Sequence, residues 1–186
     1  MLLPTLLVAL VASAGAAPDP GCPKGAPPIE QLVCTDSVLA QQDREMVRLY
    51  TQAMQGFDEG ERARQEARQS AWLTARNACA QTQAVRACVA ELYARRIIEL
   101  KILSGQLTAS ATANYFCKGA TGPVTAAYYP TEPPAALLSY TDRQVIVFVA
   151  ESGSGARYTA EDVELWEHQG QATVKWNGKD MVCSKR

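Results

Sequence analysis

The stretch Gln144-Val145-Ile146-Val147-Phe148-Val149-Ala150 consists mainly of β-branched and aromatic residues, the types that favour extended backbone. Two similar stretches come before it, Val-Thr-Ala-Ala-Tyr-Tyr at 124–129 and Ala-Ala-Leu-Leu-Ser-Tyr at 135–140, and prolines separate the two. This half of the chain is therefore predicted to be built of short strands.

Tight-turn signals follow these strands. Asn177-Gly178 accepts the positive φ angles of a type I′ hairpin, and Gln169-Gly170 is a weaker candidate for the hairpin before it. Successive short strands joined by tight turns predict a small antiparallel β-barrel over residues 115–186. The sequence Thr-Ala-Ser-Ala-Thr-Ala-Asn at 108–114 is typical of a linker, which is expected over residues 107–114.

Before this linker, apolar residues repeat with the period of a helix. A first helix is expected to start at Thr35 or Asp36 and to end at Gly56, and a second to run from about Asp58 to Ala78. One face of a third helix carries Val85, Val89, Leu92, Arg96 and Leu100, which are mainly apolar. Short connections predict three antiparallel helices around one core, in a helical domain over residues 17–106. The predicted fold class is therefore α+β in two modules.

Residues 1–16 are predicted to be an export signal. An apolar run from Leu2 to Val11 leads into Ala14-Gly15-Ala16, which suits cleavage by a signal peptidase. Cys22 follows Asp19-Pro20-Gly21 rather than an apolar run, so no lipid anchor is expected. No later apolar run approaches the roughly 18 residues of a membrane span. We therefore expect a soluble periplasmic or secreted protein without a membrane anchor.

Charge and composition argue against two classes of protein. The 18 basic and 19 acidic residues give a net charge of −1, which argues against a surface that neutralises the phosphates of a nucleic acid. With 47% hydrophobic and 20% charged residues, the composition is that of a folded globular protein rather than a disordered one.

All six cysteines lie beyond the predicted signal, and in an oxidising compartment they predict three disulfides. Cys117 and Cys183 stand at the two ends of the predicted barrel, where a bridge would stabilise the fold by about 4 kcal/mol in the chain-entropy model. The pairing of the four others stays open: Cys22, Cys34, Cys79 and Cys88. With no Cys-x-x-Cys pair and a single histidine, neither a zinc site nor another cofactor is expected.

A set of residues in the helical half follows a recognisable spacing around the core Trp-Leu-x-x-Arg-Asn-x-Cys. The set is Cys22, Gln31-Leu32-Val33-Cys34, Leu39, Asp43, Tyr50, Gln69, Trp72-Leu73, Arg76-Asn77-Ala78-Cys79, Cys88, Tyr93 and Arg95-Arg96-Ile97. In this pattern the half resembles the LprI-type domain of exported bacterial proteins. The resemblance implies a three-helix, disulfide-stapled module, linked in some members to lysozyme inhibition.

The strand-rich half carries a second pattern. It consists of Tyr115-Phe116-Cys117, Ser152-Gly153-Ser154-Gly155-Ala156-Arg157-Tyr158, Trp166, Ala172 and Cys183. In these residues the half resembles the MliC/PliC family of inhibitors of C-type lysozyme. The resemblance implies an eight-stranded antiparallel barrel whose Ser-Gly loop enters the cleft of a host lysozyme. The family's second motif is Trp-x-Lys-Gly, whereas this chain has His168 in place of the lysine and Gln169 in place of the glycine.

The loop has a chemistry that suits such a cleft. A C-type lysozyme works with two carboxyl groups, one protonated and one ionised, on either side of the scissile bond. Ser154 offers a hydroxyl donor, and glycines on both sides of it allow close backbone approach. The residues expected to bind or position lysozyme are Ser152, Gly153, Ser154, Gly155, Arg157, Tyr158 and His168. Among these, Arg157 is expected to pair with an acid and Tyr158 to anchor the loop in the barrel.

Three other interpretations stay open. The Ser-Gly sequence alone is typical of a flexible turn, and His168 alone of an exposed strand residue near a turn. Ser154 and His168 would also suit a nucleophile and base, but Gly-x-Ser-x-Gly is absent, and Asp162 or Asp180 as third member is a guess. Finally, the helical half is also consistent with a scaffold that binds another envelope component. Oligomeric state is open, a homodimer included.

Overall fold

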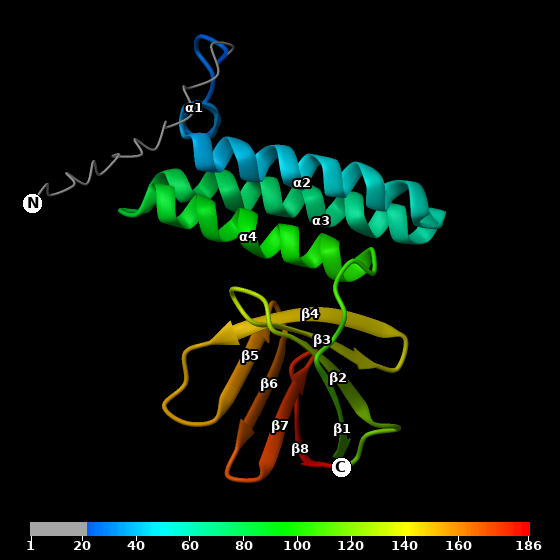
Figure 1. Ribbon diagram of the computed structural model, residues 1–186. Coiled ribbons are helices and arrows are strands. Elements are labelled where there is room, and N and C mark those ends of the chain that lie inside the picture. Colours follow the sequence, from blue (N-terminus) through cyan, green and yellow to red (C-terminus); the bar gives the residue numbers. More distant parts are fainter. Residues whose placement is uncertain (1–21) are drawn as a thin grey trace, which may run out of the picture.

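The computed structural model describes residues 22–186, so the predicted export signal at residues 1–16 lies outside the described residues. A bundle of helices is stacked on a closed β-barrel, and the chain passes from the first to the second after helix α4 (Figure 1). The predicted fold class, a disulfide-stapled helical module followed by an eight-stranded antiparallel barrel, is confirmed. None of the helices in residues 22–186 is long and apolar enough to cross a membrane.

The three predicted helices form as α2, α3 and α4, and a short helix, α1, precedes them. The helices are α1 (Pro28–Thr35), α2 (Ser37–Gly56), α3 (Glu59–Ala78) and α4 (Val85–Leu103), with a short 3₁₀ turn at Cys79–Gln81. The Asp36 carboxylate accepts hydrogen bonds from the first backbone N–H groups of α2, and Asp58 does the same for α3. Helix α1 was not expected, because the predicted helices began only at Thr35 or Asp36. Pro28 occupies the first turn of α1, where the missing N–H costs nothing.

Several polar side chains of the LprI-like pattern lie in the helical core and form hydrogen bonds there. The guanidinium of Arg76 donates to the Tyr93 hydroxyl at 3.2 Å, and that hydroxyl donates to Asp43 at 2.8 Å. Burial, with Asp43 beside it, raises the pKa of Tyr93 to about 12. The indole of Trp72 donates to the Leu92 carbonyl at 3.0 Å. These bonds tie α2, α3 and α4 together through groups that would be costly to bury alone.

The three predicted disulfides form. Cys22 bonds to Cys34 and Cys79 to Cys88, which settles the pairing that the spacing left open. Both bridges close short loops in the helical half. The third bridge, Cys117 to Cys183, joins the first and last strands of the barrel as expected.

The barrel is an up-and-down meander in which each strand pairs antiparallel with the next and the last closes on the first. Its strands are β1 (Ala111–Cys117), β2 (Val124–Tyr129), β3 (Ala135–Tyr140), β4 (Arg143–Ala150), β5 (Ala156–Ala160), β6 (Val163–His168), β7 (Gln171–Trp176) and β8 (Lys179–Lys185). Both predicted hairpin turns have positive φ at their two central residues, Asn177-Gly178 and Gln169-Gly170. Residues 111–114, expected in the linker, belong to β1.

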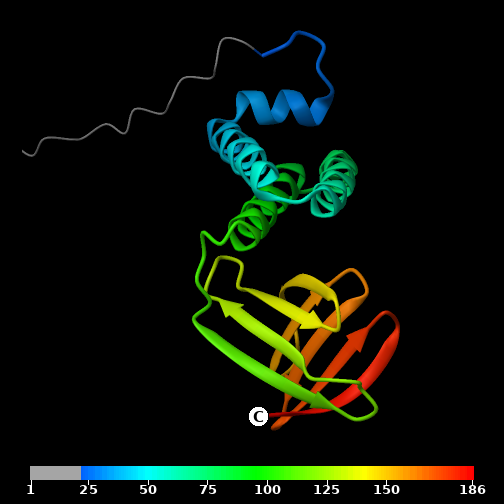
Figure 2. The same cartoon turned by 90° about the vertical axis from the view of Figure 1, so that its right-hand side faces the viewer.

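The two modules pack directly on each other through an apolar contact that the sequence patterns did not indicate. Ile98 and Ile102 of α4 join a buried cluster with Tyr129, Ile146 and Phe148 of the barrel. Helix α4 is the helix nearest the barrel when the molecule is seen from two perpendicular sides (Figures 1 and 2). The helical half is thus seated on the barrel rather than tethered to it.

We expect the Cys117–Cys183 bridge to supply much of the barrel's stability. Replacing both cysteines by serine should lower the free energy of unfolding by about 4 kcal/mol, because the open chain regains the entropy of a 66-residue separation. Urea titration followed by tryptophan fluorescence measures the loss. The double replacement of Cys79 and Cys88, whose separation is 9 residues, is the control and should cost clearly less. Equal losses would contradict the entropic account.

Candidate functional site

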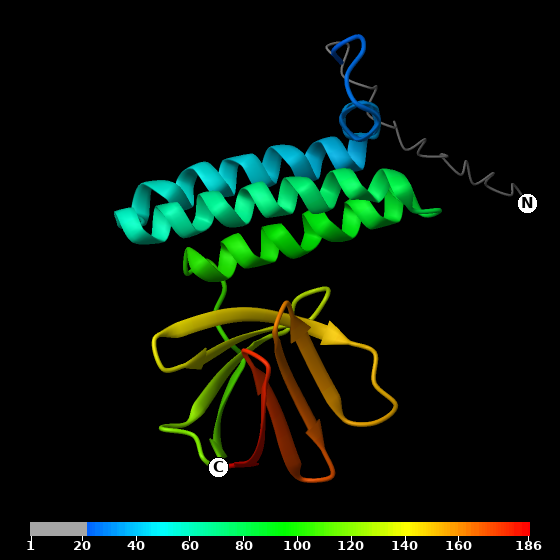
Figure 3. The same ribbon diagram turned by 180° about the vertical axis from the view of Figure 1, so that it is seen from behind.

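The predicted lysozyme-binding loop lies between β4 and β5, and residues 151–155 are all exposed. In the view from behind, the loop projects at the right-hand edge of the barrel, beyond the end of β4 (Figure 3). The segment is short and made of small residues, so the strands behind it must define its shape. Those strands are β5, which continues it, and β6, which pairs with β5.

Strand β6 holds the tip of the loop through two aromatic side chains. The Trp166 indole N–H donates to the Ser154 carbonyl at 3.0 Å. The Ser154 hydroxyl lies 2.9 Å from Nδ1 of His168, and the His168 ring stacks on Trp166 with centroids 5.3 Å apart. Ser154 and His168, 14 residues apart in sequence, are therefore direct partners. The sequence had suggested such a pair only in the hydrolase interpretation, whereas in the lysozyme interpretation each residue was expected to contact lysozyme separately.

Gly155 brings the loop into contact with the backbone of β6. Its φ of +73° is one that residues with a side chain rarely adopt, and an added Cβ would lie 1.9 Å from the Glu167 carbonyl oxygen. Gly153 differs, since an added Cβ would meet nothing within 4 Å. The Ser152 hydroxyl donates to the Gly155 carbonyl at 3.0 Å and closes the turn. One of the two glycines is therefore required by the fold itself.

Arg157 and Tyr158 serve the barrel beneath the loop. The Arg157 guanidinium donates twice to Glu164 of β6, at 2.6 and 3.0 Å, so its acidic partner is internal. Tyr158 packs against the barrel core and meets Tyr128 edge-on, with centroids 5.7 Å apart. Burial raises the pKa of Tyr158, and the nearby Glu167 carboxylate adds to this. The anchoring role expected for Tyr158 agrees with these contacts.

A partly buried polar network supports β6, and sequence patterns gave no sign of it. The Glu167 carboxylate accepts from Lys185 at 2.9 Å and from the Tyr128 hydroxyl at 3.3 Å, and Tyr128 in turn bonds to Tyr115. Burial acts to raise the pKa of Glu167, but the hydrogen bonds from Lys185, Tyr115 and Tyr128 outweigh it and hold the pKa below its usual range. The carboxylate is thus kept ionised, and its backbone carbonyl is fixed under Gly155.

The distance between Ser154 and His168 also suits a nucleophile and a general base, so the acids proposed as third member matter. Asp162 precedes β6 while His168 ends it, and the Asp162 carboxylate accepts from Arg143 at 2.9 Å. In the strand register, Asp180 lies opposite Lys175, near the end of β7, whereas His168 lies opposite Gln171, at the start of β7. Both acids therefore lie at the far end of the strands, where neither orients the imidazole. Residues 22–186 contain no cluster of three or more potential metal-binding side chains.

Both halves of the chain match families of lysozyme inhibitors. A family profile described as "Lysozyme inhibitor LprI" matches residues 22–100, and one described as "Membrane-bound lysozyme-inhibitor of c-type lysozyme" matches residues 115–182. The proteins named Lipoprotein LprI in Mycobacterium tuberculosis and Mycobacterium bovis are each 38% identical to the chain over 191 aligned residues, which cover 96% of this chain and 95% of the relative. The chain belongs to the LprI family.

The two glycines of the loop provide a matched test of its geometry. Gly155→Ala should lower the free energy of unfolding by about 1–3 kcal/mol, because it combines an unfavourable φ with a backbone clash. Gly153→Ala should change it by less than about 0.5 kcal/mol, since the space around it is open. Urea titration of both variants measures the difference. Equal stability of the two variants would show that Glu167 does not fix the loop.

Proposed function

We propose that this protein is an exported inhibitor of C-type lysozyme that acts by inserting the Ser152–Tyr158 loop into the active-site cleft. The observation that carries the proposal is an exposed Ser-Gly tip held in one shape by β6, in a chain whose two halves both match lysozyme-inhibitor families. Inhibition by occlusion requires neither chemistry nor a cofactor. A loop ordered before binding loses little further entropy on insertion, which favours tight binding.

The Ser154–His168 pair gives the tip its polarity. When the imidazole is neutral and accepts at Nδ1, the Ser154 proton is directed inward. When the imidazole is protonated, Nδ1–H donates to the Ser154 oxygen, and the hydroxyl proton is free to point outward to a carboxylate of lysozyme. The protonated ring also brings a positive charge towards the acidic pair. His168 occupies the position at which the family's second motif has a lysine.

Export is proposed from two observations. The first 16 residues have the features of a signal peptide, and the mycobacterial relatives are named lipoproteins. A periplasmic or secreted location would allow the disulfides to form and would bring the protein together with a lysozyme from a host. Residues 17–106 are proposed to be the helical module, and the barrel module, which carries the lysozyme-binding loop, is proposed to begin with β1 at Ala111.

Ser154→Ala tests the insertion directly. The variant should raise the inhibition constant for hen egg-white lysozyme at least tenfold, because it removes the donor aimed at the carboxyl groups (about 1.4 kcal/mol or more). Lysis of a bacterial cell-wall suspension, followed by turbidity, measures the constant. Ser70→Ala, on the exposed face of α3, is the control and should inhibit like the wild type.

Other outcomes favour other functions. If the wild-type protein forms no complex with lysozyme at micromolar concentration on gel filtration, the scaffold function of the helical half gains support and inhibition is wrong. Labelling of Ser154 by a serine-reactive fluorophosphonate would indicate a hydrolase instead.

Inhibition should depend on pH through His168. The wild-type inhibition constant should fall as the pH is lowered from about 8 to about 6, because histidine is the type of side chain whose charge responds to pH near neutrality. His168→Lys keeps a positive charge over the whole range and should give a flat profile. The measurement is the same turbidity assay at several pH values, corrected for the activity of lysozyme alone. A wild-type constant that is unchanged across the range would rule out this role of His168.

A further inference from the structure

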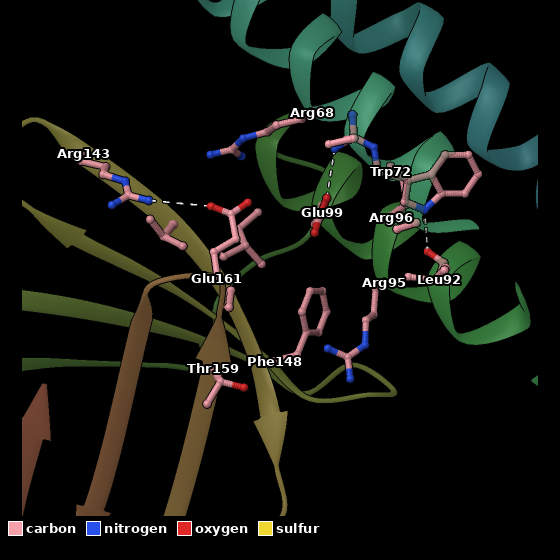
Figure 4. Close-up of a pocket in the computed structure, with 15 residues that line it drawn as sticks. Arg68, Trp72, Leu92, Arg95, Arg96, Glu99, Arg143, Phe148, Thr159 and Glu161 are labelled. Atoms are coloured by element: carbon pink, nitrogen blue, oxygen red, sulfur yellow. Dashed lines mark hydrogen bonds and ion pairs between the residues drawn. The ribbon is translucent and has the colours of Figure 1, made fainter. Parts of the chain in front are cut away.

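A groove runs between the helical half and the barrel, on a part of the molecule that the loop does not use. It consists of two adjoining cavities of about 310 and 700 Å³, both lined by Arg68 of α3 and Arg143 of β4. Figure 4 shows Arg68 and Arg143 reaching towards each other from the helical and barrel sides, with Glu161 beside them. Together the cavities have the size of a site for a ligand of two sugar units or more.

The groove holds a guanidinium without a close carboxylate. Arg143 pairs with Asp162 at 2.9 Å, and Arg96 pairs with Glu99 at 3.0 Å. Arg68 lines both cavities and is only partly exposed, yet within residues 22–186 it has no ion pair shorter than 4.0 Å. The Glu61 and Glu99 carboxylates act on it only through space. A carboxylate ligand would supply the forked partner that a guanidinium favours.

The remaining lining selects against a simple inorganic anion. Glu99 and Glu161 face the same cavity and would repel an ion that carries negative charge all round. They would instead accept hydrogen bonds from hydroxyl or amide groups. The cavity wall between the charges is apolar and includes Ala71, Val145 and Ile146. A ligand with one carboxylate, several donors and an apolar ring face fits this combination.

We propose that the groove binds an acidic acetamido saccharide, with its carboxylate on Arg68 and its hydroxyl and amide groups on Glu99 and Glu161. Such sugars occur in peptidoglycan wherever the stem peptide has been removed from N-acetylmuramic acid, because the peptide otherwise holds the lactyl carboxyl as an amide. The inference deepens the proposed function and rests on it for the source of the ligand, and the inhibitor would then be retained on peptide-free stretches of the glycan that a lysozyme cleaves. The loop and the groove use different residues, so each activity can be lost without the other.

The test compares two disaccharides of the same frame by calorimetry on the mature protein. N-acetylglucosaminyl-N-acetylmuramic acid carries a carboxylate, and di-N-acetylchitobiose lacks it. The wild type should bind the acidic sugar about tenfold more tightly, the size of one charge-assisted contact. Arg68→Gln should abolish this preference, and Arg68→Lys should keep part of it. Arg48→Gln, on the exposed face of α2, is the control and should keep all of it.

Three results would overturn the proposal. They are equal affinity for the two sugars, no binding of either to the wild type at millimolar concentration, and a preference that survives in a folded Arg68→Gln protein. A free acidic dipeptide that binds more tightly than the sugars would also overturn the saccharide class. Lysozyme inhibition by Arg68→Gln should equal that of the wild type. If Ser154→Ala inhibits normally while Arg68→Gln loses the sugar preference, the loop mechanism fails and the groove assignment stands.

Discussion

The close approach of Gly155 to the Glu167 carbonyl is the contact on which the proposed site depends. A loop of serine and glycine has many conformations of similar energy, and fixing each residue costs roughly 1–2 kcal/mol. Here three consecutive residues of β6 offset that cost. The Glu167 backbone packs closely against Gly155. Trp166 donates to the Ser154 carbonyl, and His168 hydrogen-bonds to the Ser154 hydroxyl. The loop is ordered before any partner arrives, so binding energy need not be spent on ordering it.

The position of Glu167 depends in turn on the closure of the barrel. Its carboxylate is held by Lys185 of β8 and by Tyr128 of β2, two strands that flank β1. The Cys117–Cys183 bridge joins β1 to β8 within the same ladder. A change at the seam of the barrel therefore reaches the loop through few contacts. The disulfide is therefore connected to the loop through β8, Lys185 and Glu167.

The features that the sequence predicted are those encoded by neighbouring residues. Asp36 and Asp58 start helices, and Asn177-Gly178 forms a hairpin, because each acts on backbone groups within a few positions. Helix α1 was missed because the predicted helices began only at Thr35 or Asp36, although the segment starts with Pro28, a residue compatible with the first turn of a helix. The strand residues 111–114 were missed because Ala-Thr-Ala-Asn consists of small and polar residues, and both alanine and asparagine are uncommon in strands.

The sequence singled out the residues of the candidate loop but not the side-chain contacts that hold it. The loop and His168 could be singled out from the sequence, and their pairing was considered only as a nucleophile and base. The bond from Trp166 to the Ser154 carbonyl was not indicated, because strand pairing joins residues at a separation that no periodicity encodes. The same reason applies to the partners of Arg157 and Glu167. Arg157 has a carboxylate partner seven residues away on the next strand, and Lys185 reaches Glu167 across the barrel seam. Non-local polar pairs of this kind follow from topology, not from local pattern.

Helix α4 belongs to two cores at once, which determines how the modules can move. Ile97 and Leu100 face the helical bundle, while Ile98 and Ile102 face the barrel. Separating the modules would expose the second pair, at about 1.5–3 kcal/mol for each side chain. The helical half is therefore held in a fixed orientation relative to the loop. The α3–α4 turn and the loop lie on the same side of the molecule (Figures 1 and 3). A partner seated on the loop would meet the helical half as a rigid neighbour.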